Sequence, residues 1–157
     1  MTKLDRLFTE YGESHQNETN QLIHWIFVPL IFLSVIGLLW DVKLGVSLSF
    51  LDGEPLNAAM IVTALAFAYY LNLSFSISVG MLAVSGAGLL ICYRFGNDLP
   101  MSVWKISLII FVVSWIMQFV GHKIEGKKPS FFKDLQFFLI GPIWVLAKLY
   151  KKLGIKY

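Results

Sequence analysis

The sequence contains little charge and almost no cysteine. Only 15% of its 157 residues are charged and 57% are hydrophobic, whereas soluble domains average about 25% charged and about 45–50% apolar residues. The single cysteine, Cys92, lies in an apolar run and cannot form an internal disulfide, and no Cys-x-x-Cys pair is present. The low charge and a mean hydropathy of +0.68 predict one integral membrane domain over residues 1–157, in place of a soluble or disulfide-stabilised one.

Several catalytic and binding motifs are also missing. The sequence has no Gly-x-Ser-x-Gly, no cysteine beside a base, no pair of acids inside an apolar run, and no RNA- or DNA-binding pattern. In a membrane protein, a net charge of +3 is typical of topology signals and of contact with anionic headgroups. We therefore expect membrane lipids as partners and no nucleic acid.

The apolar stretches predict an all-α, polytopic helical bundle. A bilayer core about 30 Å thick requires about 20 apolar residues in a helix, and Asn17 or Asn20 would cap the first one. Residues 41–55 form a predicted loop. Four membrane-spanning helices are predicted, over about 22–40, 58–73, 75–93 and 102–120.

The last apolar segment, 135–150, is short and is divided by Gly141 and Pro142. Its length favours an interfacial or re-entrant helical segment, and a fifth span is the alternative.

Basic residues predict the orientation of the bundle. Residues 1–21 carry four acids and no apolar core, so we expect no cleaved signal and a retained first helix. Lysines concentrate after the fourth span, which predicts cytoplasmic N- and C-termini in a bacterial inner membrane or the endoplasmic reticulum. Eight of the thirteen basic residues lie there: Lys123, Lys127, Lys128, Lys133, Lys148, Lys151, Lys152 and Lys156.

The chain has only three histidines, and this topology places all of them at one membrane face. His15 precedes the first span, His24 lies in its first turn, and His122 ends the fourth span. The turn-prone residues 16–20 would let His15 fold back toward His24. The three imidazoles are therefore expected in one layer.

Such a cluster would suit a transition metal. Neutral imidazole is the commonest ligand of such metals, and a cluster with open positions suits zinc or non-haem Fe(II). Three histidines, or two together with Glu125 or Glu18, would form the ligand set. The alternatives are ordinary polar histidines at the headgroup level, and a Glu125 that only accompanies neighbouring lysines.

Other polar residues would support this site. Gln118 shares a helical face with His122, and Tyr11 lies four residues before His15, where it would be a hydrogen-bonded partner. Asn17 and Asn20 would stabilise the turn.

The loop lysines Lys123, Lys127 and Lys128 would meet lipid headgroups or a substrate carboxylate. Trp115, Phe119 and Trp144 are assigned to packing or to an interfacial aromatic belt.

Two stretches carry a resemblance to a known family. "EYGESHQNETNQLIHWIFVPLIF" and "QFVGHKIEGKKPSFFKDLQFFLIGPIWVLAKL" resemble the small membrane family of yeast-type 2-hydroxy fatty acid dioxygenases, over essentially the whole chain. The specific features are Tyr-x3-His-x-Asn-x6-His followed by a proline, and Phe-Val-Gly-His followed by Lys-Lys-Pro.

The resemblance implies an Fe(II)-dependent oxygenase that uses dioxygen to shorten a 2-hydroxy fatty acid by one carbon. It maps the iron ligands, which are also the catalytic residues, onto His15, His24 and His122. The family pattern places its acid one residue further on than Glu125, so no ligand role carries over to Glu125. The acyl chain would lie between the spans, with its carboxylate and 2-hydroxyl at the cytoplasmic face.

Two other functions stay open on the sequence alone. One is a different metal-dependent lipid enzyme, such as a zinc hydrolase, and the other is a non-enzymatic lipid-binding membrane protein. Anaerobic assay and metal analysis would separate them.

Overall fold

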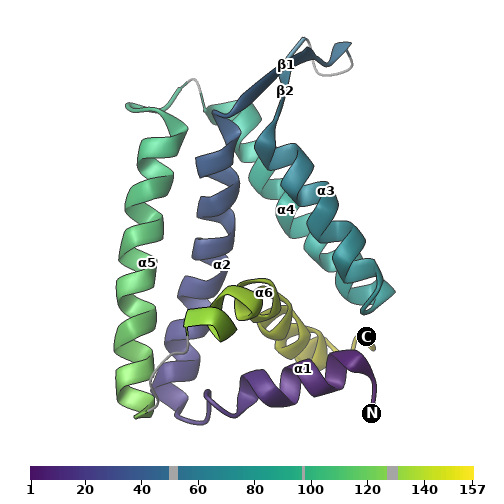
Figure 1. The fold of residues 1–157 in the computed structure, drawn as a ribbon, viewed down its shortest axis with the longest axis vertical. Helices are drawn as coiled ribbons and strands as arrows, with labels where there is room; N and C mark the ends of the chain where they lie inside the picture. Colours follow the sequence, from purple (N-terminus) through teal and green to yellow (C-terminus); the bar gives the residue numbers. More distant parts are fainter. Residues whose placement is uncertain (50–52, 97, 127–130) are drawn as a thin grey trace.

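The computed structural model describes residues 1–49, 53–96, 98–126 and 131–157, and the side chains of all of these except 131–136. It is predominantly helical, as predicted, but strands β1 (Lys43–Ser47) and β2 (Pro55–Asn57) pair antiparallel in the segment expected to be a loop. Figure 1 shows the helices among these residues: α1 (Lys3–Gly12), α2 (Glu18–Trp40), α3 (Ala58–Leu71), α4 (Phe75–Phe95), α5 (Val103–Glu125) and α6 (Phe131–Leu153).

Helices α2 to α5 form the bundle, and three of them are long and apolar enough to cross a membrane. These are α2, α4 and α5. Helix α3 is apolar but has 14 residues, about 21 Å at 1.5 Å per residue, which is shorter than the bilayer core. The structure thus supports three of the four predicted spans by length, and α3 ends two residues before the predicted boundary.

Side-chain caps explain where the helices begin. The Asn17 side chain accepts hydrogen bonds from the amides of Thr19 (2.9 Å) and Asn20 (3.2 Å) at the start of α2. Asn57 caps α3 in the same way through the amide of Met60, at 3.1 Å. Each cap satisfies amides that have no partner inside the helix, and Asn17 confirms the predicted choice for α2.

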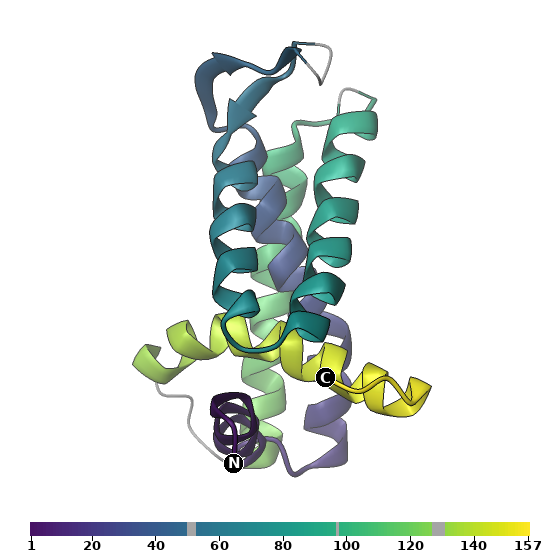
Figure 2. The same cartoon turned by 90° about the vertical axis from the view of Figure 1, so that its right-hand side faces the viewer.

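Helices α1 and α6 lie across the end of the bundle where α2 begins and α5 ends, and both chain termini lie at this end (Figure 2). The crossing orientation agrees with an interfacial α6. The predicted division at Gly141 and Pro142 is wrong, because α6 runs through both residues. Pro142 has no amide hydrogen to donate to the carbonyl of Phe138, so the helix continues with one bond fewer. Nearby, the Tyr70 hydroxyl donates to the carbonyl of Leu139 at 3.0 Å and ties α6 to α3.

A close contact fixes α6 against α1 and α2. A Cβ atom at Gly141 would lie 2.9 Å from the Tyr11 hydroxyl and 3.1 Å from a methyl of Val28. Leu4, Leu7 and Tyr11 of α1 are buried against this part of the molecule. The contact sets where α1 ends, and therefore where the following turn can go.

Candidate metal centre

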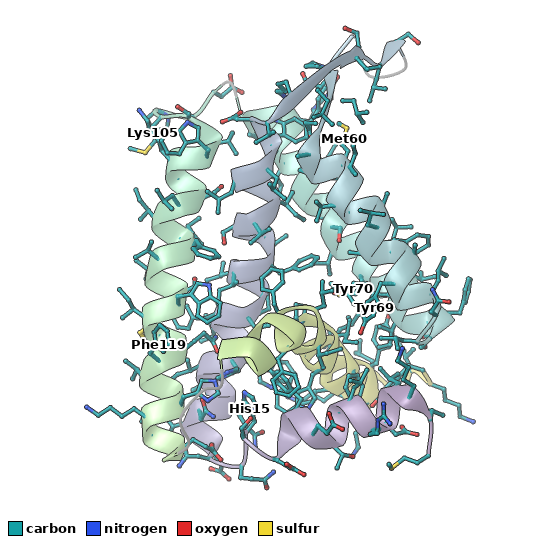
Figure 3. All side chains as sticks on the ribbon, in the orientation of Figure 1. His15, Met60, Tyr69, Tyr70, Lys105 and Phe119 are labelled. Atoms are coloured by element: carbon teal, nitrogen blue, oxygen red, sulfur yellow. The ribbon has the colours of Figure 1, made fainter. Side chains whose placement is uncertain are left out.

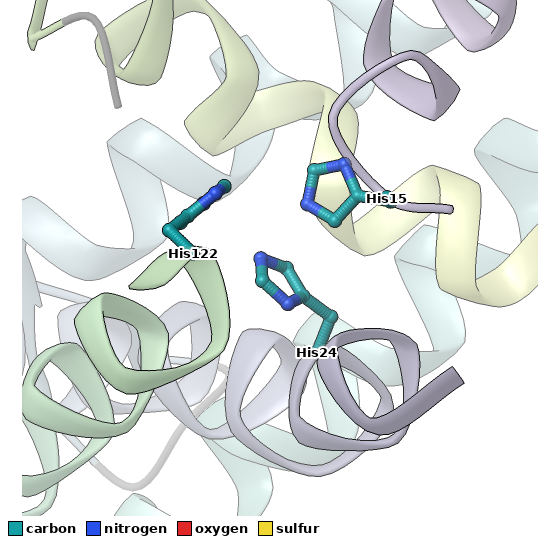
Figure 4. A group of neighbouring side chains, drawn as sticks. All are labelled: His15, His24 and His122. Atoms are coloured by element: carbon teal, nitrogen blue, oxygen red, sulfur yellow. The ribbon is translucent and has the colours of Figure 1, made fainter. Parts of the chain in front are cut away.

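The structure brings the three histidines together from distant parts of the chain. His15 lies in the turn between α1 and α2, His24 on α2, and His122 in the last turn of α5, with their rings directed toward one another (Figure 4). Ring centroids are 4.2 Å apart for His15 and His24, 5.3 Å for His15 and His122, and 5.1 Å for His24 and His122. The cluster lies at the end of the bundle opposite Met60 and Lys105 (Figure 3).

Hydrogen bonds fix the orientation of two of the imidazoles. His15 and His24 are 3% and 2% exposed. The Nδ1 of His15 donates to the carbonyl of Tyr11 at 2.6 Å, and the Nδ1 of His24 donates to the carbonyl of Asn20 at 2.9 Å. A proton on Nδ1 leaves the Nε2 lone pair as the ligand atom, which is the usual arrangement of metal-binding histidines.

Glu125 holds the turn that carries His15. One of its carboxylate oxygens accepts from the amide of Gln16 at 2.8 Å, and the other from the amide of Asn17 at 2.9 Å and the side-chain amide of Asn20 at 3.0 Å. The ligand atoms that gather within 4.8 Å of one another are those of the three histidines alone, among the residues described. Glu125 therefore connects the last turn of α5 to the turn carrying His15.

The turn itself lies earlier than the sequence indicated. It occupies residues 13–17, and Glu18 and Asn20 are already helical. The prediction of a turn over 16–20 is wrong in its boundaries, because Asn17 caps α2 and starts the helix there. The predicted consequence, that His15 returns to His24, is confirmed.

Burial keeps His15 neutral. It lowers the pKa of His15 to about 4; the neighbouring His122 and Lys148 lower it further, while the Tyr11 carbonyl and Glu125 oppose the shift. A neutral imidazole offers its lone pair to a metal without first losing a proton.

A small cavity adjoins the histidines. Its volume is about 60 Å³, well below the roughly 300–1,000 Å³ of pockets that enclose a whole ligand. Phe119 lines the cavity and is also 55% exposed, so the cavity reaches the outer surface of the bundle beside this ring. Its lining comprises Tyr11, Ser14, His15, His24, Val28, Ile31, Trp115, Gln118, Phe119, His122, Phe137, Phe138 and Gly141.

Some of the supporting residues predicted from the sequence lie at the cavity, and others do not. Gln118 is buried in the cavity wall. The ring of Tyr11 stacks on His15 with centroids 4.1 Å apart, and its carbonyl binds Nδ1 of His15. Lys123 is exposed and does not line the cavity, and Lys127 and Lys128 lie outside the described residues. Trp115 and Phe119, assigned to packing, line the cavity.

In the sequence, Lys148 indicated only topology, and its contacts with Trp144 and Gln21 were not predicted. Its ammonium lies 3.6 Å from the centre of the Trp144 ring and donates to Gln21 at 2.7 Å. Gln21 in turn donates to the carbonyl of His15 at 2.9 Å. Burial lowers the pKa of Lys148. The signal available in the sequence was the four-residue spacing of Trp144 and Lys148, which places both on one helical face.

The donor set fits a transition metal. Nε2 of His15 is buried without a hydrogen-bond partner among the described residues, which a bound metal would correct. Metal–nitrogen bonds of about 2.1 Å hold nitrogens at most about 4 Å apart. Ligand atoms within 4.8 Å of one another therefore need only a small inward movement. Three neutral imidazoles suit zinc or Fe(II).

Comparisons with known proteins identify the family of the chain. The family model described as "2-hydroxy-palmitic acid dioxygenase Mpo1-like" matches residues 1–153. The chain is similar to 2-hydroxy-palmitic acid dioxygenase MPO1 of Saccharomyces cerevisiae, with 34% identity over 146 residues, 92% of this chain and 78% of the yeast protein. No solved structure matches the chain.

Proposed function

This chain belongs to the Mpo1-like family of 2-hydroxy-palmitic acid dioxygenases, and from that premise we propose that it is an Fe(II)-dependent membrane enzyme that oxidises 2-hydroxy fatty acids with dioxygen. The product is a fatty acid one carbon shorter, and the former carboxyl carbon leaves as carbon dioxide with one water, which balances one dioxygen per substrate. His15, His24 and His122 hold the ion. The observation that carries the proposal is the meeting of three mostly buried imidazoles, one with an Nε2 that has no partner among the described residues, beside a cavity lined in part by the exposed ring of Phe119.

The residues around the three histidines have separate roles. When bound, Fe(II) supplies the one-electron chemistry that dioxygen requires. The carbonyls of Tyr11 and Asn20 hold His15 and His24 in the tautomer that presents Nε2, and Glu125 keeps the turn of His15 against α5.

The cavity is the size of a head group rather than of a whole lipid. With about 60 Å³, it takes the carboxyl end of the substrate and its first carbons. Val28, Ile31 and Phe119 contact those carbons, and each buried methylene contributes about 0.8 kcal/mol. The rest of the acyl chain stays in the bilayer beside Phe119.

A zinc hydrolase is the second candidate, because three imidazoles are also a common zinc ligand set. The two candidates differ in their need for dioxygen, since hydrolysis proceeds without it.

Product analysis tests the proposal directly. Purified protein loaded with iron should convert 2-hydroxypalmitate into the acid one carbon shorter in air, and should stop under nitrogen. His24→Ala and His122→Ala should lose both stoichiometric iron and turnover, whereas Glu54→Gln, at the far end of the bundle, should keep both. Turnover that continues without dioxygen, or histidine variants that retain iron and activity, would refute the proposal.

A further inference from the structure

Two hydrogen-bond donors in the cavity wall have no acceptor among the described residues. Gln118 is 5% exposed, and its Nε2 has no hydrogen-bond partner in the described part of the chain; the same is true of the buried Nε1 of Trp115. Both residues line the cavity that contains the three histidines. A buried donor without a partner is costly to the fold, so two in one small cavity indicate a ligand.

Helical spacing places the two donors in line with the histidine cluster. Trp115, Gln118 and His122 are separated by three and four residues on α5, and such residues share one face of a helix. The neighbouring rings of Phe111 and Phe119 hold the indole of Trp115 on both sides, with centroids 6.1 and 5.9 Å away. Both donors are therefore presented to the cavity from a fixed surface.

The polar hydrogens on the opposite wall already have acceptors. The Nδ1 atoms of His15 and His24 are bound to backbone carbonyls, and the hydroxyl of Ser14 donates to the carbonyl of Tyr11. The described part of the cavity wall offers no acceptor to the side-chain nitrogens of Gln118 and Trp115. Water fits a cavity of this size and can occupy it at rest, but a substrate that enters must replace the bonds that water makes.

Resting on the proposed function, we propose that Trp115 and Gln118 bind the carboxylate of the fatty acid. A carboxylate accepts hydrogen bonds and donates none, which matches a wall whose open groups are donors. A hydroxyl would carry its own hydrogen to the same wall. Binding of the carboxylate on the α5 side places the neighbouring hydroxylated carbon beside the histidines, so the pair selects acids and positions the bond to be cleaved.

Ligand affinity in metal-free protein tests this assignment without relying on turnover. The probes are 2-hydroxypalmitate, palmitate, and hexadecane-1,2-diol, which keeps the hydroxyl but replaces the carboxylate. Trp115→Phe and Gln118→Leu should each weaken both acids about ten-fold or more, as expected for hydrogen bonds to a charged group, and leave the diol unchanged. Trp104→Phe, on the same helix but at the other end of the bundle, should change none of them.

Turnover then separates this proposal from the preceding one. Both variants should raise KM with iron content at the wild-type level, and near-native thermal unfolding would show that they are folded. If Gln118→Leu does not fold, Trp115→Phe alone decides the outcome.

Equal weakening of acids and diol, weakening confined to the hydroxylated probes, or no change would each overturn the carboxylate assignment. An acid-selective loss in a protein whose wild type gives no shortened product would uphold the assignment and reject the proposed reaction.

Discussion

Each end of the bundle contains a cavity, and the charged side chains that line the larger cavity are already paired with other groups. At the β1–β2 end a cleft of about 340 Å³ is lined by charged residues that are already partnered. Lys43 pairs with Glu54 and lies over Trp40, and Asp41 accepts from the amide of Trp104 at 3.3 Å. At the histidine end about 60 Å³ adjoins Nε2 of His15 and the side-chain nitrogens of Trp115 and Gln118, which are buried without a hydrogen-bond partner among the described residues. Among the described residues, buried nitrogens without a hydrogen-bond partner line the small cavity and not the larger cleft, so unpaired groups in the lining, rather than volume, mark the site.

The ends also differ in what covers them. Helices α1 and α6 lie across the histidine end (Figure 2), whereas every residue of β1 is exposed at the other end. A covered end can keep imidazoles dry and uncharged, and an open end leaves its charges in contact with solvent.

The largest expected difference between the ends is in their response to acid. The pKa of His15 is about 4 in the folded protein and about 6.5 in an unfolded chain. Below pH 6.5 the unfolded chain therefore binds a proton that the folded one does not. Stability is full above pH 6.5 and falls by about 3 kcal/mol as the pH drops to 4.

Equilibrium unfolding of the metal-free protein in detergent measures this loss. His15→Gln should reduce the slope between pH 6.5 and 4, and Glu54→Gln should leave that slope as it is. An unaltered slope in His15→Gln would show that the acid sensitivity arises elsewhere.

The second prediction concerns Glu125. In Glu125→Gln one of the two acceptor oxygens and the negative charge are lost, so the bonds to Gln16, Asn17 and Asn20 cannot all form. Metal affinity should fall about 10- to 100-fold, as is common for residues that orient metal ligands. Competition with a chelating dye measures the affinity. Glu18→Gln, an exposed acid in the first turn of α2, is the matched control and should retain wild-type affinity.

A third prediction tests the close packing of α6. In Gly141→Ala the new methyl would meet the Tyr11 hydroxyl and Val28, which should cost about 1–2 kcal/mol of stability. Gly86→Ala, inside α4 where nothing lies within 4 Å, should keep or raise the stability, by up to about 1 kcal/mol. The two variants can be compared by thermal unfolding. Equal effects would mean that α6 does not depend on a glycine at this contact.

The smallest effect is expected at the far end. Lys43→Met removes an ion pair whose side chains are 34% and 25% exposed, and such pairs contribute less than about 1 kcal/mol. Metal content and turnover should be unchanged. A loss of activity here would break the distinction between the two ends.

The sequence was sufficient to bring the histidines to one end, because spans can be counted by their length and the chain alternates direction between them. This argument needs no knowledge of packing, and it also indicated that α6 is too short in apolar residues to cross. It could not say how α6 is held. One contact that holds α6 is the hydrogen bond from Tyr70 of α3 to Leu139, which joins residues far apart in the sequence and which no local pattern encodes.

Other features were hidden for identifiable reasons. The residues of β1 alternate, with Leu44 and Val46 between Lys43, Gly45 and Ser47, but the nearby glycines, aspartates and proline favoured a loop. Trp115 was assigned to packing because most of α5 is apolar, whereas Gln118 was already expected to share a helical face with His122. The use of Glu125 depends on a contact with Gln16 across 109 residues. The contact between Glu125 and Gln16 forms only in the assembled bundle.

That last contact also sets an order of events during synthesis. The turn that carries His15 leaves the ribosome early, but its carboxylate partner is made 109 residues later, about 5–20 s afterwards at 5–20 residues per second. His122 arrives only three residues before Glu125. Before these residues are made, the chain contains His24 and, on a turn that Glu125 does not yet hold, His15. The third histidine and the carboxylate that holds the turn are therefore added together, near the end of synthesis.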